Sequence, residues 1–130
     1  MPIELDHLLV PVRDRQASAQ LLAQILDVPW VETGIGPFSP VYVSDSLTLD
    51  FDEAQAPYPV QHYCFRVDDA SFDAILARIE RLALPYRSTP HGAVDRRVNT
   101  EHGGRIVYWQ GPDIHHWEML TRSYERRPGA

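Results

Sequence analysis

The chain has 130 residues, of which 44% are hydrophobic, and this is enough for one globular domain with its own apolar core. A formal net charge of −6 and dispersed basic residues, all of them arginine, argue against a nucleic-acid partner. No apolar run approaches the roughly 20 residues that a membrane helix needs, and residues 1–4 do not begin a signal peptide. We therefore expect a cytoplasmic protein with no membrane partner, in which the single cysteine, Cys64, is a free buried thiol.

The first half of the chain predicts a strand, a helix and three short strands. Residues 3–12 alternate as a strand, and Asp14 is placed to cap a helix that runs to about Asp27. The apolar positions of this helix recur at helical spacing. Glycine and proline residues then separate short strands near 30–35, 39–44 and 46–53.

The second half predicts the same order of elements after a linker at residues 56–59. A strand at 60–67 precedes a helix that Asp68 or Asp69 caps, and this helix has a clear apolar stripe. The stripe consists of Phe72, Ile75, Leu76, Ile79 and Leu82. The remaining strands are expected near 85–87, 94–99, 105–110 and 115–121.

The two halves repeat each other around His7 and His62. A valine stands five positions after each histidine and an aspartate seven positions after it, at a constant offset of 55 residues. This internal duplication predicts that the two histidines occupy equivalent places about a pseudo-twofold axis.

The period of two along each strand decides which side chains share a face. In 60–67 the apolar set packs under the helices, which sends His62, Cys64 and Arg66 to the opposite, concave face. Glu118 in the last strand of the second half and Asp50 in the last strand of the first half are counterparts. Two histidines and a carboxylate form a set that non-haem divalent metals prefer. Arg66 is then a candidate partner for an anionic substrate, or it extends to the pocket edge.

At this point the sequence resembles a known family, the vicinal oxygen chelate superfamily. The resemblance rests on the two histidine segments and on the closing run at 104–120, and it covers about residues 3–121. The superfamily includes glyoxalase I, extradiol dioxygenases, fosfomycin-resistance thiol transferases and bleomycin-resistance proteins. The resemblance implies an α+β fold in one domain. Two tandem βαβββ modules, about 3–53 and 60–121, would form a curled mixed sheet around a metal-centred pocket.

Carried over residue by residue, the resemblance implies that His7, His62 and Glu118 ligate one divalent ion, which would be zinc, iron, nickel or manganese. Tyr108, ten residues before Glu118, matches a position that lines the pocket in many members. There it would donate a hydrogen bond to a developing oxyanion. Asp50 is either a fourth ligand or a carboxylate that contacts substrate, and an isomerisation would need Glu118 or Asp50 as its base.

We therefore expect a metal-dependent glyoxalase-like lyase or extradiol-type dioxygenase that acts on a small molecule with vicinal oxygens. The alternative is a metal-free protein that sequesters an aromatic antibiotic, as bleomycin-binding relatives do. Small two-module relatives commonly dimerise, so a homodimer is expected, with each site inside one chain or shared by two.

The other histidines are not expected to be ligands. His115 and His116 flank a turn, where they are expected at the surface or beside the ligands. His91 and His102 are expected in solvent-exposed loops.

Overall fold

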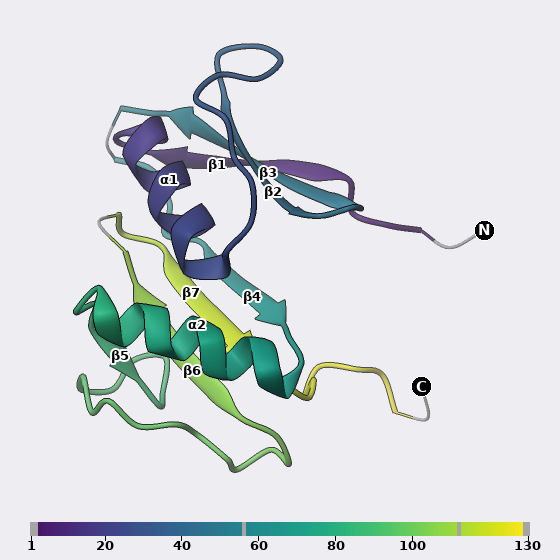
Figure 1. The fold of residues 1–130 in the computed structure, drawn as a ribbon, viewed down its shortest axis with the longest axis vertical. Coiled ribbons are helices and arrows are strands. Elements are labelled where there is room, and N and C mark those ends of the chain that lie inside the picture. The colour runs from purple at the N-terminus through teal and green to yellow at the C-terminus, as the bar shows by residue number, and fades with distance from the viewer. Residues whose placement is uncertain (1–2, 56, 112, 129–130) are drawn as a thin grey trace. The chain divides into compact units, whose positions relative to one another are not determined.

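The computed structural model describes residues 3–55, 57–111 and 113–128, and it divides the chain into two compact units, Met1–Pro59 and Val60–Ala130. Each unit has a strand, a helix and further strands that form a mixed sheet (Figure 1). The prediction of an α+β fold with two βαβββ-like modules is confirmed. The boundary between the units follows Pro59, in the expected linker, of which Ala56 lies outside the described residues.

Unit 1, Met1–Pro59, is a three-stranded sheet with one helix packed on it (Figure 1). Its elements are β1 (His7–Val12), α1 (Arg15–Leu26), β2 (Ser39–Ser44) and β3 (Leu47–Glu53). The central strand β3 pairs in parallel with β1 and antiparallel with β2. The buried residues Val10, Ile25 and Phe51 belong to its core, which explains why α1 lies over the sheet.

Unit 2, Val60–Ala130, is a four-stranded sheet crossed by a second helix (Figure 1). Its elements are β4 (His62–Arg66), α2 (Asp69–Arg81), β5 (Tyr86–Arg87), β6 (Ile106–Gln110) and β7 (His116–Leu120). The strand order is β4-β7-β6-β5, and β4 pairs in parallel with β7. Phe72 and Ile79 of the predicted helix stripe are fully buried.

Both helices begin at the aspartates that the sequence predicts as caps. The side chain of Asp14 accepts a hydrogen bond from the backbone N–H of Ala17 at 3.1 Å. The side chain of Asp68, rather than Asp69, accepts one from the backbone N–H of Ser71 at 2.7 Å. These bonds satisfy backbone donors that have no partner inside the helix.

The register of the sheets confirms that Asp50 and Glu118 are counterparts. Leu9 of β1 pairs with Asp50 of β3, and Cys64 of β4 pairs with Glu118 of β7. Both pairings are parallel and lie two residues beyond the histidine of the same unit. The duplication in the sequence is therefore a duplication of strand register.

The predictions of strands at 30–35 and 94–99 are wrong, because each segment forms only an isolated β-bridge. In 30–35 the chain keeps only the bridge from Trp30 to Val41 before it turns, with Gly36 at a φ of 76°. In 94–99 the backbone of Arg96 is left-handed, with a φ of 53°, and a single bridge joins Asn99 to Ile106. A left-handed residue interrupts the extended backbone that a strand ladder requires.

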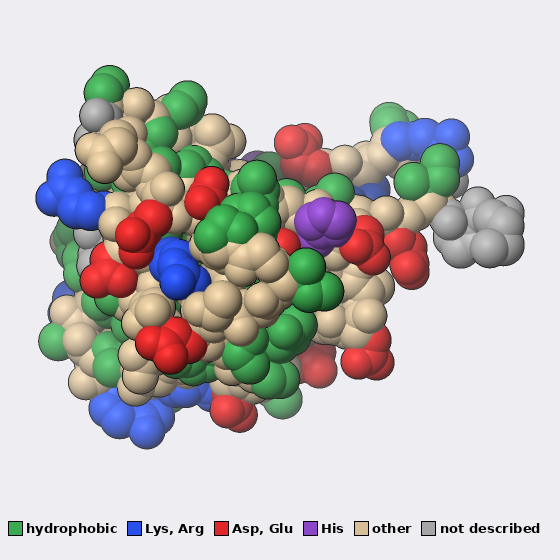
Figure 2. Space-filling model, turned by 90° about the horizontal axis from the view of Figure 1, so that it is seen from above, with side chains coloured by type: hydrophobic (Ala, Val, Ile, Leu, Met, Phe, Trp, Pro, Cys, Tyr) green, Lys and Arg blue, Asp and Glu red, His purple; other side chains and the backbone are tan. Residues whose placement is uncertain are grey.

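The distribution of surface charge and the length of the helices match the expectations from the composition. Acidic and basic side chains are interspersed on the face drawn in Figure 2, without a large patch of one sign. Within the described ranges, no helix is both long and apolar enough to cross a membrane.

Candidate metal centre and substrate pocket

Two of the predicted metal ligands, His62 and Glu118, meet in unit 2. They stand on the neighbouring parallel strands β4 and β7, and the period of two turns both side chains to the same face of the sheet. The Nε2 atom of His62 lies 2.7 Å from Oε1 of Glu118. The imidazole is 46% exposed and the carboxylate is 0% exposed, so the carboxylate lies deeper in the protein than the histidine.

Two tyrosines surround the Glu118 carboxylate. The Tyr124 hydroxyl lies 2.9 Å from Oε2 and 3.1 Å from Oε1, close enough to donate to either oxygen. Tyr108 of β6 is the antiparallel register partner of Glu118, and its ring meets that of His62 edge-on at 6.1 Å. Desolvation, followed by the nearby charge of Glu118, raises the pKa of Tyr108, so its hydroxyl is a proton donor at neutral pH. Sequence reasoning missed Tyr124, which lies beyond the repeated segments.

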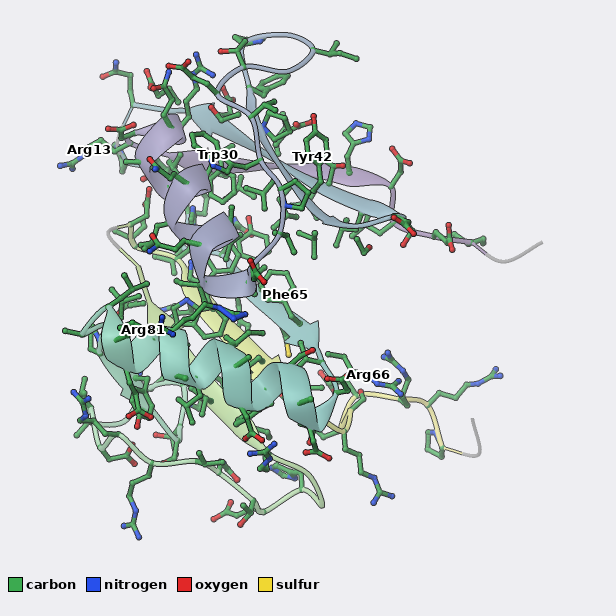
Figure 3. The ribbon with its side chains drawn as sticks, viewed as in Figure 1. Arg13, Trp30, Tyr42, Phe65, Arg66 and Arg81 are labelled. Carbon is green, nitrogen blue, oxygen red and sulfur yellow. The ribbon has the colours of Figure 1, made fainter. Side chains whose placement is uncertain are left out.

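A cavity of about 320 Å³ opens beside this group of residues. One wall consists of His62, Cys64 and Arg66 of β4, and the other consists of residues 123–126 after β7. Arg66 stands at the end of β4 near the C-terminal segment, as Figure 3 shows. The prediction that His62 and Arg66 share the pocket face is confirmed, since both line this cavity.

The prediction that Cys64 is a buried thiol is wrong, because the residue is exposed on the pocket face. The alternation along β4 that exposes His62 and Arg66 exposes Cys64 between them. Partial desolvation and the charge of Glu118 raise the pKa of this thiol to about 12. It is therefore a neutral group in the cavity wall and a poor nucleophile at pH 7.

The other predicted ligand, His7, and its companion Asp50 lie in unit 1. Both line a second cavity of about 390 Å³, together with Thr48 and the rings of Phe38 and Tyr42. The Nδ1 atom of His7 lies 2.7 Å from Oδ2 of Asp6. This hydrogen bond raises the pKa of His7.

The structure therefore brings the predicted site residues together in two sets. His62, Glu118, Tyr108 and Arg66 belong to unit 2, whereas His7 and Asp50 belong to unit 1. Within the described ranges, no three His, Cys, Asp or Glu side chains gather as a metal cluster. The chemistry of the donors nevertheless fits a divalent ion, because an imidazole nitrogen and a buried carboxylate oxygen converge in unit 2.

His115 is fully buried, which excludes the surface as one of its two expected places. Its Nδ1 atom accepts a hydrogen bond from the backbone N–H of Gln61 at 3.0 Å, which ties the start of β4 to that of β7. His116 is half-buried, and desolvation lowers its pKa. His91 and His102 are exposed in loops, as expected.

The chain is similar to several solved structures over nearly its whole length. It is 35% identical to Oxidase ChaP-H2, with a TM-score of 0.89. The match covers 96% of this chain and 98% of the oxidase chain. It is 41% identical to Oxidase ChaP-H1, with a TM-score of 0.85, and this match covers 96% of the chain and 100% of Oxidase ChaP-H1. The fosfomycin resistance protein FosX from Mesorhizobium loti is 22% identical, with a TM-score of 0.69. This match covers 95% of the chain and 96% of FosX. No protein-family model and no curated protein matches the chain.

Proposed function

Because this chain belongs to the vicinal oxygen chelate superfamily, we propose that it is a divalent-metal-dependent oxidase that acts on a small molecule with vicinal oxygens. The observation that carries the proposal is the convergence of His62 Nε2 and Glu118 Oε1 at 2.7 Å on one face of the unit 2 sheet. The similarity to two proteins named as oxidases favours oxidation over a glyoxalase-like isomerisation.

The metal would be held by His7, His62 and Glu118. A divalent ion with these ligands would supply a Lewis acid with open positions for two neighbouring substrate oxygens. The burial of Glu118 is compatible with this role, because a positive ion would add to the hydrogen bonds that already offset the cost of burying the carboxylate.

The contact between His7 and Asp6 supports the assignment of His7. Histidines that bind metals usually donate their second ring N–H to a carboxylate, which fixes the orientation of the ring. The Nδ1 atom of His7 has such a partner in Asp6 Oδ2, at 2.7 Å, which leaves Nε2 as the ligand atom. We also propose a homodimer in which a site takes His7 from one chain and His62 with Glu118 from the other. The place of His7 in a different unit from the other two ligands is compatible with this arrangement.

The remaining pocket residues would bind and orient the substrate. Tyr108 would donate a hydrogen bond to a substrate oxygen, which its raised pKa supports. Arg66 lines the same cavity as His62, where its guanidinium would pair with an anionic part of the substrate. Asp50 would contact the substrate from the cavity of unit 1, next to the aromatic walls that Phe38 and Tyr42 provide.

Calorimetry with a matched pair of ligands tests this function. Catechol and phenol differ only in the second oxygen, so they separate chelation from ring stacking. We expect protein loaded with iron(II) under anaerobic conditions to bind catechol at least about tenfold more tightly than phenol, because two oxygens reach the ion. The preference should vanish in the Glu118→Ala variant. Equal affinities, or affinities that do not change when the metal is removed, would support the metal-free sequestering protein instead.

A further inference from the structure

We propose that Tyr124 is a positioning residue for Glu118, so that the segment after β7 belongs to the metal site. The inference rests on the proposed function, because it concerns a residue that acts through a metal ligand. It assigns a role to residues 121–126, which lie at the end of the region of resemblance or beyond it.

The geometry of the carboxylate gives the two oxygens of Glu118 different surroundings. Oε1 lies 2.7 Å from His62 Nε2, while Oε2 has the shorter of the two contacts with the Tyr124 hydroxyl, at 2.9 Å against 3.1 Å. A hydroxyl donor shared between two oxygens of one carboxylate fixes the plane of that carboxylate. Tyr124 thus fixes the group so that Oε1 faces the imidazole.

Tyr124 is itself held in place by the elements around it. Its ring packs at a tilt against the ring of His102, with the centroids 5.2 Å apart. At the start of the segment, Thr121 Oγ1 accepts the backbone N–H of Arg105 at 2.9 Å, and the Thr121 N–H donates to the Arg105 carbonyl at 3.0 Å. The hydroxyl is therefore directed at Glu118 by a segment anchored to Arg105, the residue before β6.

A bound metal would change the contact between His62 and Glu118, and the Glu118 carboxylate would then need another group to hold its orientation. An ion held by His62 and Glu118 would replace the present contact between His62 Nε2 and Glu118 Oε1. The contact of Tyr124 with Oε2 is compatible with the ion, because it engages the other oxygen. Groups that hold metal ligands in this way typically contribute 10- to 100-fold to metal affinity.

The test is a cobalt(II) titration of the full-length protein, with the dissociation constant obtained by competition with a coloured chelator. Tyr124→Phe removes the hydroxyl and keeps the ring against His102. The matched control is Tyr86→Phe, which also removes a tyrosine–glutamate contact, from Tyr86 to Glu80 Oε1 at 3.4 Å. We expect Tyr124→Phe to weaken cobalt binding about 10- to 100-fold and to change the visible absorption spectrum of the bound ion. Tyr86→Phe should leave both properties unchanged.

Two further measurements separate a positioning role of Tyr124 from a purely structural one. Tyr124→Leu, which removes the hydroxyl by a different substitution, should show the same loss of affinity. Metal-free Tyr124→Phe should unfold at a somewhat lower temperature than the wild type, because the buried Glu118 carboxylate loses a hydrogen bond. A purely structural tyrosine would produce that change alone and leave the cobalt affinity and spectrum unaltered. Tyr124→Phe with wild-type affinity and spectrum overturns the inference but leaves the proposed function intact. A wild-type protein that binds no cobalt overturns both.

Discussion

The Nε2 atom of His62 lies 2.7 Å from Oε1 of Glu118, although the two residues are 56 positions apart in the chain. Parallel pairing of β4 with β7 creates this contact, and Cys64 stands directly opposite Glu118 in the same register. The buried Glu118 carboxylate raises the pKa of its neighbour Cys64, so the reactivity of this thiol reports the charge of Glu118 independently of metal binding.

Alkylation of Cys64 reports this environment. Its pKa is raised from 9.0 to about 12, first by desolvation and then by Glu118. At pH 8 the thiolate fraction should be roughly a thousandfold below that of an ordinary thiol, since each pH unit is a factor of ten. We expect iodoacetamide to react slowly with the native protein and at the ordinary rate in urea. Glu118→Gln should speed the native reaction, and an unchanged rate would show that the carboxylate charge does not reach Cys64.

The cap of α2 predicts a dependence of stability on pH. Hydrogen bonds from Ser71 lower the pKa of Asp68 below its ordinary value of 3.8. A lowered carboxyl pKa stabilises the folded state above the unfolded pKa, and this contribution is lost as the pH falls through the folded pKa. Urea unfolding should therefore show Asp68→Ala to be less stable than the wild type at pH 7, with the difference shrinking below about pH 4. Asp45→Ala, in the turn between β2 and β3, is the control that should show no such trend.

The contacts of Arg105 with α2 are expected to stabilise the fold without involving the proposed metal site. Its guanidinium contacts Asp69 at 3.0 Å and Asp73 at 2.6 Å, and it lies 4.3 Å from the ring centroid of Phe72. These contacts join the residue before β6 to the first turns of α2. We expect Arg105→Ala to lower the free energy of unfolding by about 1 kcal/mol, because the acidic partners are largely exposed.

The control for this prediction is on the same helix. Arg81 stands in the last turn of α2 (Figure 3), and among the described residues its side chain has no ion pair. Arg81→Ala should leave the denaturation midpoint close to that of the wild type. If the two variants unfold alike, the link between Arg105 and α2 does not contribute to stability.

The sequence predicted those parts of the fold that local patterns control. Asp14 and Asp68 begin helices because each can satisfy backbone N–H groups three residues ahead. The offset of 55 residues predicted the equivalent registers of Asp50 and Glu118, since a duplicated chain repeats its strand pairing. The alternation in 60–67 likewise predicted which face of β4 carries His62.

The remainder depends on contacts that no local pattern encodes. His115 follows a turn in the sequence, yet it is buried and accepts a hydrogen bond from the backbone of Gln61, the residue before β4. Tyr124 lies outside any repeat or period, and only the path of the chain after β7 brings its hydroxyl to Glu118. The expected strand at 94–99 fails at Arg96, whose left-handed backbone has no glycine or asparagine to announce it.

Complementation between two inactive variants tests the shared site. In a dimer whose sites combine His7 of one chain with His62 and Glu118 of the other, a heterodimer of His7→Ala and Glu118→Ala contains one intact site and one doubly altered site. Mixing the two variants after unfolding and refolding should therefore restore part of the bound metal. If each site lies within one chain, the mixture binds no more metal than its components. A monomer in sedimentation that still binds metal would also contradict the shared site.

The metal content of protein purified without an affinity tag shows whether His7, His62 and Glu118 hold a divalent ion. We expect one divalent ion per chain in the wild type and in His91→Ala, a control that changes an exposed loop histidine. We also expect His7→Ala, His62→Ala and Glu118→Ala each to lose most of that metal while retaining the wild-type circular dichroism spectrum. Stoichiometric metal in both His7→Ala and Glu118→Ala would contradict the proposed ligand set.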